Sequence, residues 1–216
     1  DDRISVLRGA NDISAGAGAD TIVASAGNNR ILAGDGADSV TVSWGNNRVE
    51  GGAGDDAITA SIGNNWLDGG DGADTITSVS GEALMLGGAG DDVLTVRSGN
   101  STMDGGAGAD RMTAGFDCQT FRYTALDGAS DQIFNFVRGA DRFAFAREAL
   151  GLGFTGALTA DYLSFGAANV AHGQFLFNRA AGVLMWDRDG TGAAAPTLVA
   201  TLVGVSSLTA ADFRIV

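Results

Sequence analysis

Aspartate recurs at a fixed interval through the first half of the chain. The residues stand 18 positions apart, and an apolar residue follows each of them two places later. They are Asp2, Asp20, Asp38, Asp56, Asp74, Asp92 and Asp110. A row of carboxylates is suited to binding hard divalent cations, and calcium takes roughly six to eight oxygen ligands. Paired carboxylates could also serve a glycosidase, but a whole row of them indicates cation binding.

The composition narrows the function classes. The chain has 216 residues with 34 glycines, one proline, one cysteine and a net charge of −13. Scarce proline argues against collagen, and 45% hydrophobic residues argue against disorder. The negative charge argues against a nucleic acid or an anionic membrane as partner, and no apolar stretch is long enough to span a bilayer. Because Cys118 is alone, no internal disulfide can form, so something else must stabilise the fold.

The aspartates lie in nine-residue blocks that keep one frame from Ala15 to Thr113. A representative block, Gly51–Thr59, reads Gly-Gly-Ala-Gly-Asp-Asp-Ala-Ile-Thr. Its glycines permit the positive φ of a tight turn, and the residues after Asp56 alternate as in a strand. Two blocks make one coil with a strand in each of two sheets. We therefore predict an all-β protein: a right-handed parallel β-roll with 18 residues per coil, followed by a mostly antiparallel β cap.

The predicted core has two columns of apolar residues, one for each sheet. The first column is Ile4, Ile22, Val40, Ile58, Ile76, Leu94 and Met112, and the second is Ile13, Ile31, Val49, Leu67, Met85, Met103 and Phe121. One apolar residue in nine is a thin core. Burial alone would then hardly offset the conformational entropy lost on folding, and bound cations would supply the missing stability.

The alternate blocks carry a neutral residue where the others carry Asp. That column is Asn11, Asn29, Asn47, Asn65, Ala83, Ser101 and Gln119. One interpretation is a recognition strip of Asn28, Asn46 and Asn64 with Arg30, Arg48 and Trp66. The other, which we favour, is a ladder of Asn side chains that satisfy one another. Asn is a poorer calcium ligand, so we predict ions along one edge only.

The blocks from Gly51, Gly69, Gly87 and Gly105 read Gly-Gly-x-Gly-x-Asp-x-apolar-x, which resembles the nonapeptide of RTX (repeats-in-toxin, haemolysin-type calcium-binding) proteins. The resemblance implies an ion between turns 18 residues apart, held by the Asp of both turns and by carbonyls of turn positions one to four. Five complete sites follow, between Asp20 and Asp110, and Asp2 would add a sixth. The implied turn residues are Ala15, Gly16, Ala17, Gly18, Ala33, Gly34, Asp35, Gly36, Gly51, Gly52, Ala53, Gly54, Gly69, Gly70, Asp71, Gly72, Gly87, Gly88, Ala89, Gly90, Gly105, Gly106, Ala107 and Gly108.

The regular repeats end near Arg122, where the composition shifts toward Phe and Ala. We predict a β-roll over residues 1–122 and a capping domain over residues 123–216, because the last coil needs its open strands covered. The cap should hold two short strands around Gly139 and a short helix within residues 146–166, with Thr159 as N-cap. The later strands are expected at Gln174–Asn178, Val183–Trp186, Thr197–Val203 and Phe213–Val216.

Other reactive residues are few. His172 is the only histidine, which excludes a zinc protease of the His-Glu-x-x-His type within this chain. Asp187 and Asp189 could bind one more calcium ion, although Asp-x-Asp-Gly is also ordinary turn chemistry. We interpret Cys118 as a structural thiol. The three tryptophans should pack locally; they are Trp44, Trp66 and Trp186.

The ending, Leu208 to Val216, resembles the uncleaved signals of bacterial RTX proteins exported by type I secretion, such as serralysin-type proteins. The resemblance implies a secreted or cell-surface protein that meets the secretion machinery and folds when it binds calcium outside the cell. Two alternatives stay open. One is a surface module that self-associates, as in an S-layer or adhesin. The other is the accessory domain of a secreted metalloprotease, lipase or epimerase, with any catalysis upstream of Asp1.

Overall fold

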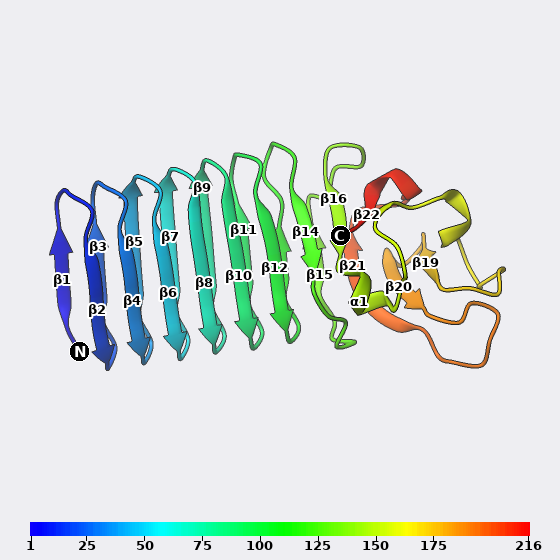
Figure 1. Ribbon diagram of the computed structural model, residues 1–216, viewed down its shortest axis with the longest axis horizontal. Coiled ribbons are helices and arrows are strands. Elements are labelled where there is room, and N and C mark those ends of the chain that lie inside the picture. The colour runs from blue at the N-terminus through cyan, green and yellow to red at the C-terminus, as the bar shows by residue number, and fades with distance from the viewer.

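The computed structural model describes all 216 residues, and its architecture confirms the predicted fold class. One sheet has 12 strands and the other has 10. Each coil contributes one strand to each sheet, so through β16 the odd-numbered strands lie in the first sheet and the even-numbered strands in the second. Figure 1 shows the coils stacked in a row, with the N-terminus at one end and the cap at the other.

The regular coils hold the first 14 strands. In the first sheet they are β1 (Arg3–Val6), β3 (Thr21–Ala24), β5 (Ser39–Trp44), β7 (Ala57–Ile62), β9 (Thr75–Ser80), β11 (Val93–Val96) and β13 (Arg111–Thr113). In the second sheet they are β2 (Asp12–Ala17), β4 (Arg30–Asp35), β6 (Arg48–Ala53), β8 (Asn65–Asp71), β10 (Ala83–Ala89), β12 (Thr102–Ala107) and β14 (Thr120–Tyr123).

The register places each residue beside the one 18 positions later. Ile22 pairs with Val40 in the first sheet, and Ile31 pairs with Val49 in the second. Parallel pairing at this constant offset keeps each apolar column continuous. Both predicted columns are buried from Ile22 onward, with exposures of 0% to 1%. Ile4 and Ile13, in the first coil, are the more exposed members.

A second inward column makes the core wider than predicted. Two places after the first column, each strand of the first sheet turns another side chain inward, because side chains alternate along a strand. These residues are Ala24, Val42, Ala60, Ser78, Val96 and Ala114, all at most 3% exposed. Sequence reasoning missed the column because four of its six residues are Ala or Ser, which carry little hydrophobic signal. The core therefore holds more buried residues than the predicted one apolar residue in each nine-residue block.

Parallel stacking continues beyond the last regular repeat. β15 (Gln132–Phe134) pairs with β13, and β16 (Arg142–Phe145) pairs with β14, both in parallel. β21 (Thr197–Val203) and β22 (Phe213–Ile215) then add to the same two sheets in parallel. The two strands predicted around Gly139 are thus present and belong to different sheets. The domain division at residue 122 stays a prediction.

The cap closes the first sheet with antiparallel strands. β19 (Gln174–Asn178) and β20 (Val183–Asp187) form the predicted hairpin, and β20 pairs with β21. Its core is aromatic: Phe213 stacks on Phe143 at 5.3 Å and meets Phe175 at 4.7 Å between ring centroids. Large rings here replace the aliphatic columns of the roll. The remaining short strands are β17 (Gly156–Ala157) and β18 (Leu163–Ser164).

The predicted range holds two short helical turns, and Thr159 is the N-cap residue of the second one. α1 (Arg147–Leu150) is a single turn that begins after Ala146 and ends at Gly151, whose φ of 66° terminates it. Thr159 instead precedes a 3-10 turn, η1 (Ala160–Tyr162), and makes no side-chain cap bond. A second such turn, η2 (Ala210–Asp212), leads into β22. None of the helices has the length and hydropathy to cross a lipid bilayer.

Candidate metal centre

The aspartates predicted as ligands line one edge of the roll. Asp38 Oδ1 accepts a hydrogen bond from the backbone N–H of Asp20 at 2.7 Å, and Asp56 Oδ1 accepts one from Asp38 at 2.8 Å. The same bond recurs between each later pair of coils. One oxygen of each carboxylate therefore links its coil to the preceding one. Asp2 is exposed and contributes its backbone N–H to Asp20.

The second oxygen of each carboxylate has no partner. The unpaired atoms are the Oδ2 atoms of Asp20, Asp38, Asp56, Asp74, Asp92 and Asp110. These six residues are only 1% to 2% exposed, so water does not satisfy them. A buried polar atom without a hydrogen bond costs roughly 1–3 kcal/mol, and an ionised one costs more. Six repeats of the same orphaned oxygen indicate a ligand of positive charge.

The orphaned oxygens point at the first position of their own turns. A methyl group on Gly51 would lie 2.2 Å from Asp56 Oδ2 and 2.5 Å from the carbonyl oxygen of Gly69. At Gly69 the corresponding distances are 2.1 Å to Asp74 Oδ2 and 2.6 Å to the carbonyl oxygen of the next turn. In these gaps a carboxylate oxygen and a main-chain oxygen therefore converge beside a glycine. In the two turns nearest the N-terminus the first position is Ala15 or Ala33.

The environment disfavours ionised carboxylates in the absence of a cation. Burial raises the pKa of Asp56 and Asp92 to about 7 and that of Asp110 to about 6. Backbone hydrogen bonds oppose this rise in pKa, and neighbouring carboxylates add to it. The pKa values of Asp38 and Asp74 are raised for the same leading reason. A divalent ion would reverse the effect, because it favours the charged form.

The turn residues stack closely around these carboxylates. At the second turn position Gly70 has φ +110°, and a methyl group there would lie 2.0 Å from the carbonyl oxygen of Gly52. The fourth position donates its N–H to the third-position carbonyl of the next coil, as Gly54 does to Asp71 at 2.7 Å. The side chains of Asp35 and Asp71 are exposed. These two residues were expected to bind calcium through their main-chain carbonyls. The third-position carbonyls accept the hydrogen bonds from the fourth-position N–H groups of the preceding coil.

The residues of this edge fit calcium. Each gap brings two buried Asp side chains, and no group of three or more His, Cys, Asp or Glu side chains gathers at one point. The roughly six to eight oxygens that calcium takes must therefore include main-chain carbonyls, which the turns present. A bound ion would neutralise facing carboxylates and link successive coils. The individual ligand assignments stay predictions.

The opposite edge shows what a neutral side chain does at the same place. Asn47 Oδ1 accepts the backbone N–H of Asn29 at 3.0 Å, as the Asp residues do. Its Nδ2, which replaces the second carboxylate oxygen, donates to Asn65 Oδ1 at 3.0 Å and to Gly45 O at 2.9 Å. No polar atom of Asn29 or Asn47 is left over. The ladder interpretation is therefore confirmed.

The outer residues of the suggested recognition strip also contact one another. Asn46 Oδ1 accepts the N–H of Asn64 at 2.8 Å. Arg48 lies over the Trp66 ring at 3.6 Å and binds Glu50 at 2.9 Å. Arg30 lies 3.3 Å from Asp12. These contacts account for the strip without a partner.

Sequence reasoning missed Asp131, which extends the aspartate row into the cap. Its Oδ1 accepts the backbone N–H of Asp110 at 3.0 Å, and the residue is 6% exposed. Burial raises its pKa to about 7. The spacing from Asp110 is 21 rather than 18 and no Gly-Gly-x-Gly turn precedes it, so the periodicity gave no signal. Asp141 takes the corresponding place on the other edge, where it accepts the N–H of Gln119 at 2.7 Å.

The remaining candidates lie outside the aspartate row. Asp187 Oδ1 accepts the N–H of Gly190 at 3.1 Å, and Asp189 Oδ2 accepts that of Ala194 at 3.0 Å. Asp189 Oδ1 has no partner, and an extra ion at this loop stays a prediction. His172 lies 3.2 Å from Asp161. Cys118 is exposed rather than packed as a structural thiol. Trp44 is 61% exposed, so the prediction of local packing was wrong for this residue. Trp186 is 4% exposed, which confirms the prediction there.

A match to a protein-family model agrees with this geometry. Residues 5–40, 41–76 and 86–117 match the family described as RTX calcium-binding nonapeptide repeat (4 copies). No curated protein matches the chain. Among solved structures, the AlgE6R3 subunit of the Azotobacter vinelandii mannuronan C5-epimerase matches with 22% identity and a TM-score of 0.42, over 70% of this chain and 80% of that one. With its Asp-bearing glycine turns in register on one edge, the β-roll of this chain carries RTX calcium-binding nonapeptide repeats.

Proposed function

We propose that the chain is a calcium-dependent folding module of a secreted or cell-surface protein. The observation that carries the proposal is the row of six buried Oδ2 atoms without a partner. Without cations the row combines desolvation with repulsion between carboxylates. With calcium, the binding free energy adds to the folding free energy, because the unfolded chain has no preformed site. We expect six ions, one for each gap from Asp20 to Asp131.

The C-terminal segment supports folding after export. Phe213 and Ile215 are 2% and 1% exposed, and β22 pairs with β16 inside the second sheet. A secretion signal that includes this strand could be read by type I machinery only before the cap folds. Low calcium inside the cell would keep the chain unfolded, and extracellular modules bind calcium at about 10⁻⁴–10⁻³ M. The module has a binding role in this proposal, and no catalytic one.

Circular dichroism and thermal unfolding with and without calcium test the proposal. The metal-stripped chain should lack most of its strand signal at pH 7.5, and millimolar calcium should restore it together with a cooperative unfolding transition. Magnesium at the same concentration is the control, because its smaller octahedral shell does not suit this edge. Equal strand content and equal Tm with chelator and with calcium would overturn the proposal.

A further inference from the structure

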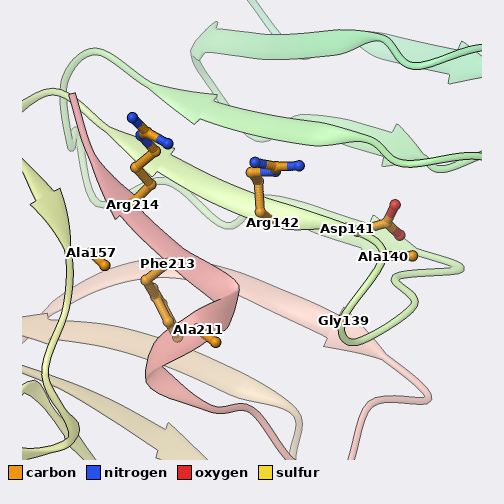
Figure 2. Close-up of a pocket in the computed structure, with 8 residues that line it drawn as sticks. All are labelled: Gly139, Ala140, Asp141, Arg142, Ala157, Ala211, Phe213 and Arg214. Carbon is orange, nitrogen blue, oxygen red and sulfur yellow. The ribbon is translucent and has the colours of Figure 1, made fainter.

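A pocket of about 280 Å³ lies where the last coil meets the cap, on the edge that carries the Asn ladder. Figure 2 shows the residues that line it, including Arg142, Ala157, Ala211 and Arg214. Arg142 is on β16 and Arg214 is on the neighbouring strand β22. Neither residue belongs to the aspartate row, and the calcium function does not use this pocket.

The two arginines extend from the same side of the sheet (Figure 2). Phe143 pairs with Phe213 and both rings point inward, so the side chains beside them turn outward. Arg142 and Arg214 are exposed, and neither is in an ion pair. Arg214 pairs with Ala144, two residues from Arg142, so the two positive charges lie diagonally across adjacent strands. Two unpaired arginines here are also unexpected in a chain of net charge −13.

The nearby acids form no ion pair with these arginines. Asp141 accepts the backbone N–H of Gln119 and of Val137, each at 2.7 Å. Asp212 accepts the N–H of Thr209 at 2.6 Å and that of Gly139 at 3.2 Å. Both carboxylates are 2% exposed. Because their oxygens bind backbone N–H groups, the guanidinium N–H groups keep their donors for a ligand.

We propose that Arg142 and Arg214 form a binding site for an oxyanion, a carboxylate or sulfate group. Guanidinium presents planar paired donors that match the two oxygens of such a group, and these charge-assisted bonds are among the stronger hydrogen bonds. The pocket volume admits one acidic group with a small attached residue. Ala157 and Ala211 line the pocket without charge, and Asp141, which also lines it, directs its oxygens to backbone N–H groups. The anion comes either from a free salt or from an acidic sugar, and both present the same chemistry.

Calorimetric titration of the calcium-loaded full chain tests the site. The probes are sodium sulfate and a hexuronate trisaccharide, each at constant calcium, and the probe that binds identifies the source. We expect saturable binding that is at least tenfold weaker in Arg142→Gln and in Arg214→Gln. Arg8→Gln is the control, because Arg8 is exposed, is in no ion pair and gives the same change in charge.

Amide chemical shifts give a second measurement that needs no variant. Bound probe should shift the resonances of residues 139–142 and 211–214 and leave those of the aspartate edge unchanged. Two results would overturn the site: no saturable binding of either probe, or equal affinity in the chain and in both Gln variants. Shifts confined to the aspartate edge would also contradict it, since they would report an effect on bound calcium.

Discussion

Aspartate and asparagine occupy equivalent positions on the two edges of the roll, and one atom separates their effects. In both, Oδ1 accepts the backbone N–H of the residue 18 positions earlier. Asn47 then donates its Nδ2 to two oxygens, whereas Asp56 leaves its Oδ2 without a donor. On the Asn edge, the amide nitrogen donates hydrogen bonds that satisfy the neighbouring oxygens. On the Asp edge, the second carboxylate oxygen finds no donor, so this edge depends on a cation.

This difference predicts a sign reversal for Asp56→Asn. In calcium the variant should unfold more easily by about 1–3 kcal/mol, the range for losing a buried charged contact. In chelator it should be more stable than the parent chain, because one buried charge is removed and an amide donor replaces it. Denaturant unfolding measures the effect in calcium, and the strand content by circular dichroism measures it in chelator.

Asp55→Asn is the matched control for that variant. It removes the same charge one residue away, but Asp55 is exposed and its Oδ1 accepts the N–H of Ala73. Its effect should be small in calcium and in chelator alike. If Asp56→Asn destabilised the chain equally in both solutions, the difference between the two edges would not lie in cation binding.

At the scale of the elements, glycine turns set how closely the coils stack. Gly16 and Gly70 hold the same turn position with φ +108° and φ +110°. A methyl group on Gly70 would lie 2.0 Å from a carbonyl of the preceding coil, and one on Gly16, in the first coil, would meet nothing within 4 Å. Substituting Ala at each of these two glycines therefore distinguishes the cost of backbone strain from the cost of crowding the neighbouring coil.

We expect Gly16→Ala to cost about 1–3 kcal/mol of unfolding free energy, from φ strain alone. Gly70→Ala should cost about 1–3 kcal/mol more, the range for overpacking a close contact. Calcium-saturated unfolding curves give both values. Equal costs for the two variants would mean that contact between coils does not limit the turn.

The sequence predicted most elements because the repeat carries three signals at once. Gly marks each turn, Asp or Asn follows it, and one apolar residue such as Ile58 or Leu67 marks each strand. Beyond Phe121 the three signals no longer occur together. The hairpin at Gln174–Asn178 was located only by the alternation of side chains along its strand. It could not show that β15 and β16 extend the two sheets, because parallel pairing over an irregular interval leaves no local pattern.

The candidate site could be predicted from the same repeat signals, and only as far as the regular repeats extend. The aspartate edge follows from the spacing, but Asp131 lies off that spacing and only its contact with Asp110 reveals it. The unpaired Oδ2 atoms could not be predicted either, because they depend on which oxygen the neighbouring backbone takes. The free arginines required knowledge of where Asp141 and Asp212 direct their oxygens.

At the scale of the whole molecule, the aspartate row couples stability to pH. The folded pKa values of about 6 to 7 for Asp56, Asp92, Asp110 and Asp131 exceed the value of about 3.9 in an unfolded chain. The folded state therefore binds more protons. Their stabilising contribution is complete below pH ~4 and is lost as pH rises through about 7.

The metal-stripped chain should accordingly lose strand content as the pH rises from 5 to 8. In saturating calcium the Tm should rise over the same range, because protons compete with the ion for the carboxylates. Circular dichroism in matched buffers measures both trends. Metal-free strand content that increased with pH would mean that the carboxylates are not the groups that limit stability.

Calcium between successive turns is the central claim, and anomalous scattering from crystals grown in millimolar calcium tests it most directly. We predict peaks in the gaps from Asp20 to Asp131, with each ion bound to oxygens of two coils and no peak beside Asn29, Asn47 or Asn65. Well-ordered crystals with empty gaps between Asp38, Asp56 and Asp74 would contradict the account.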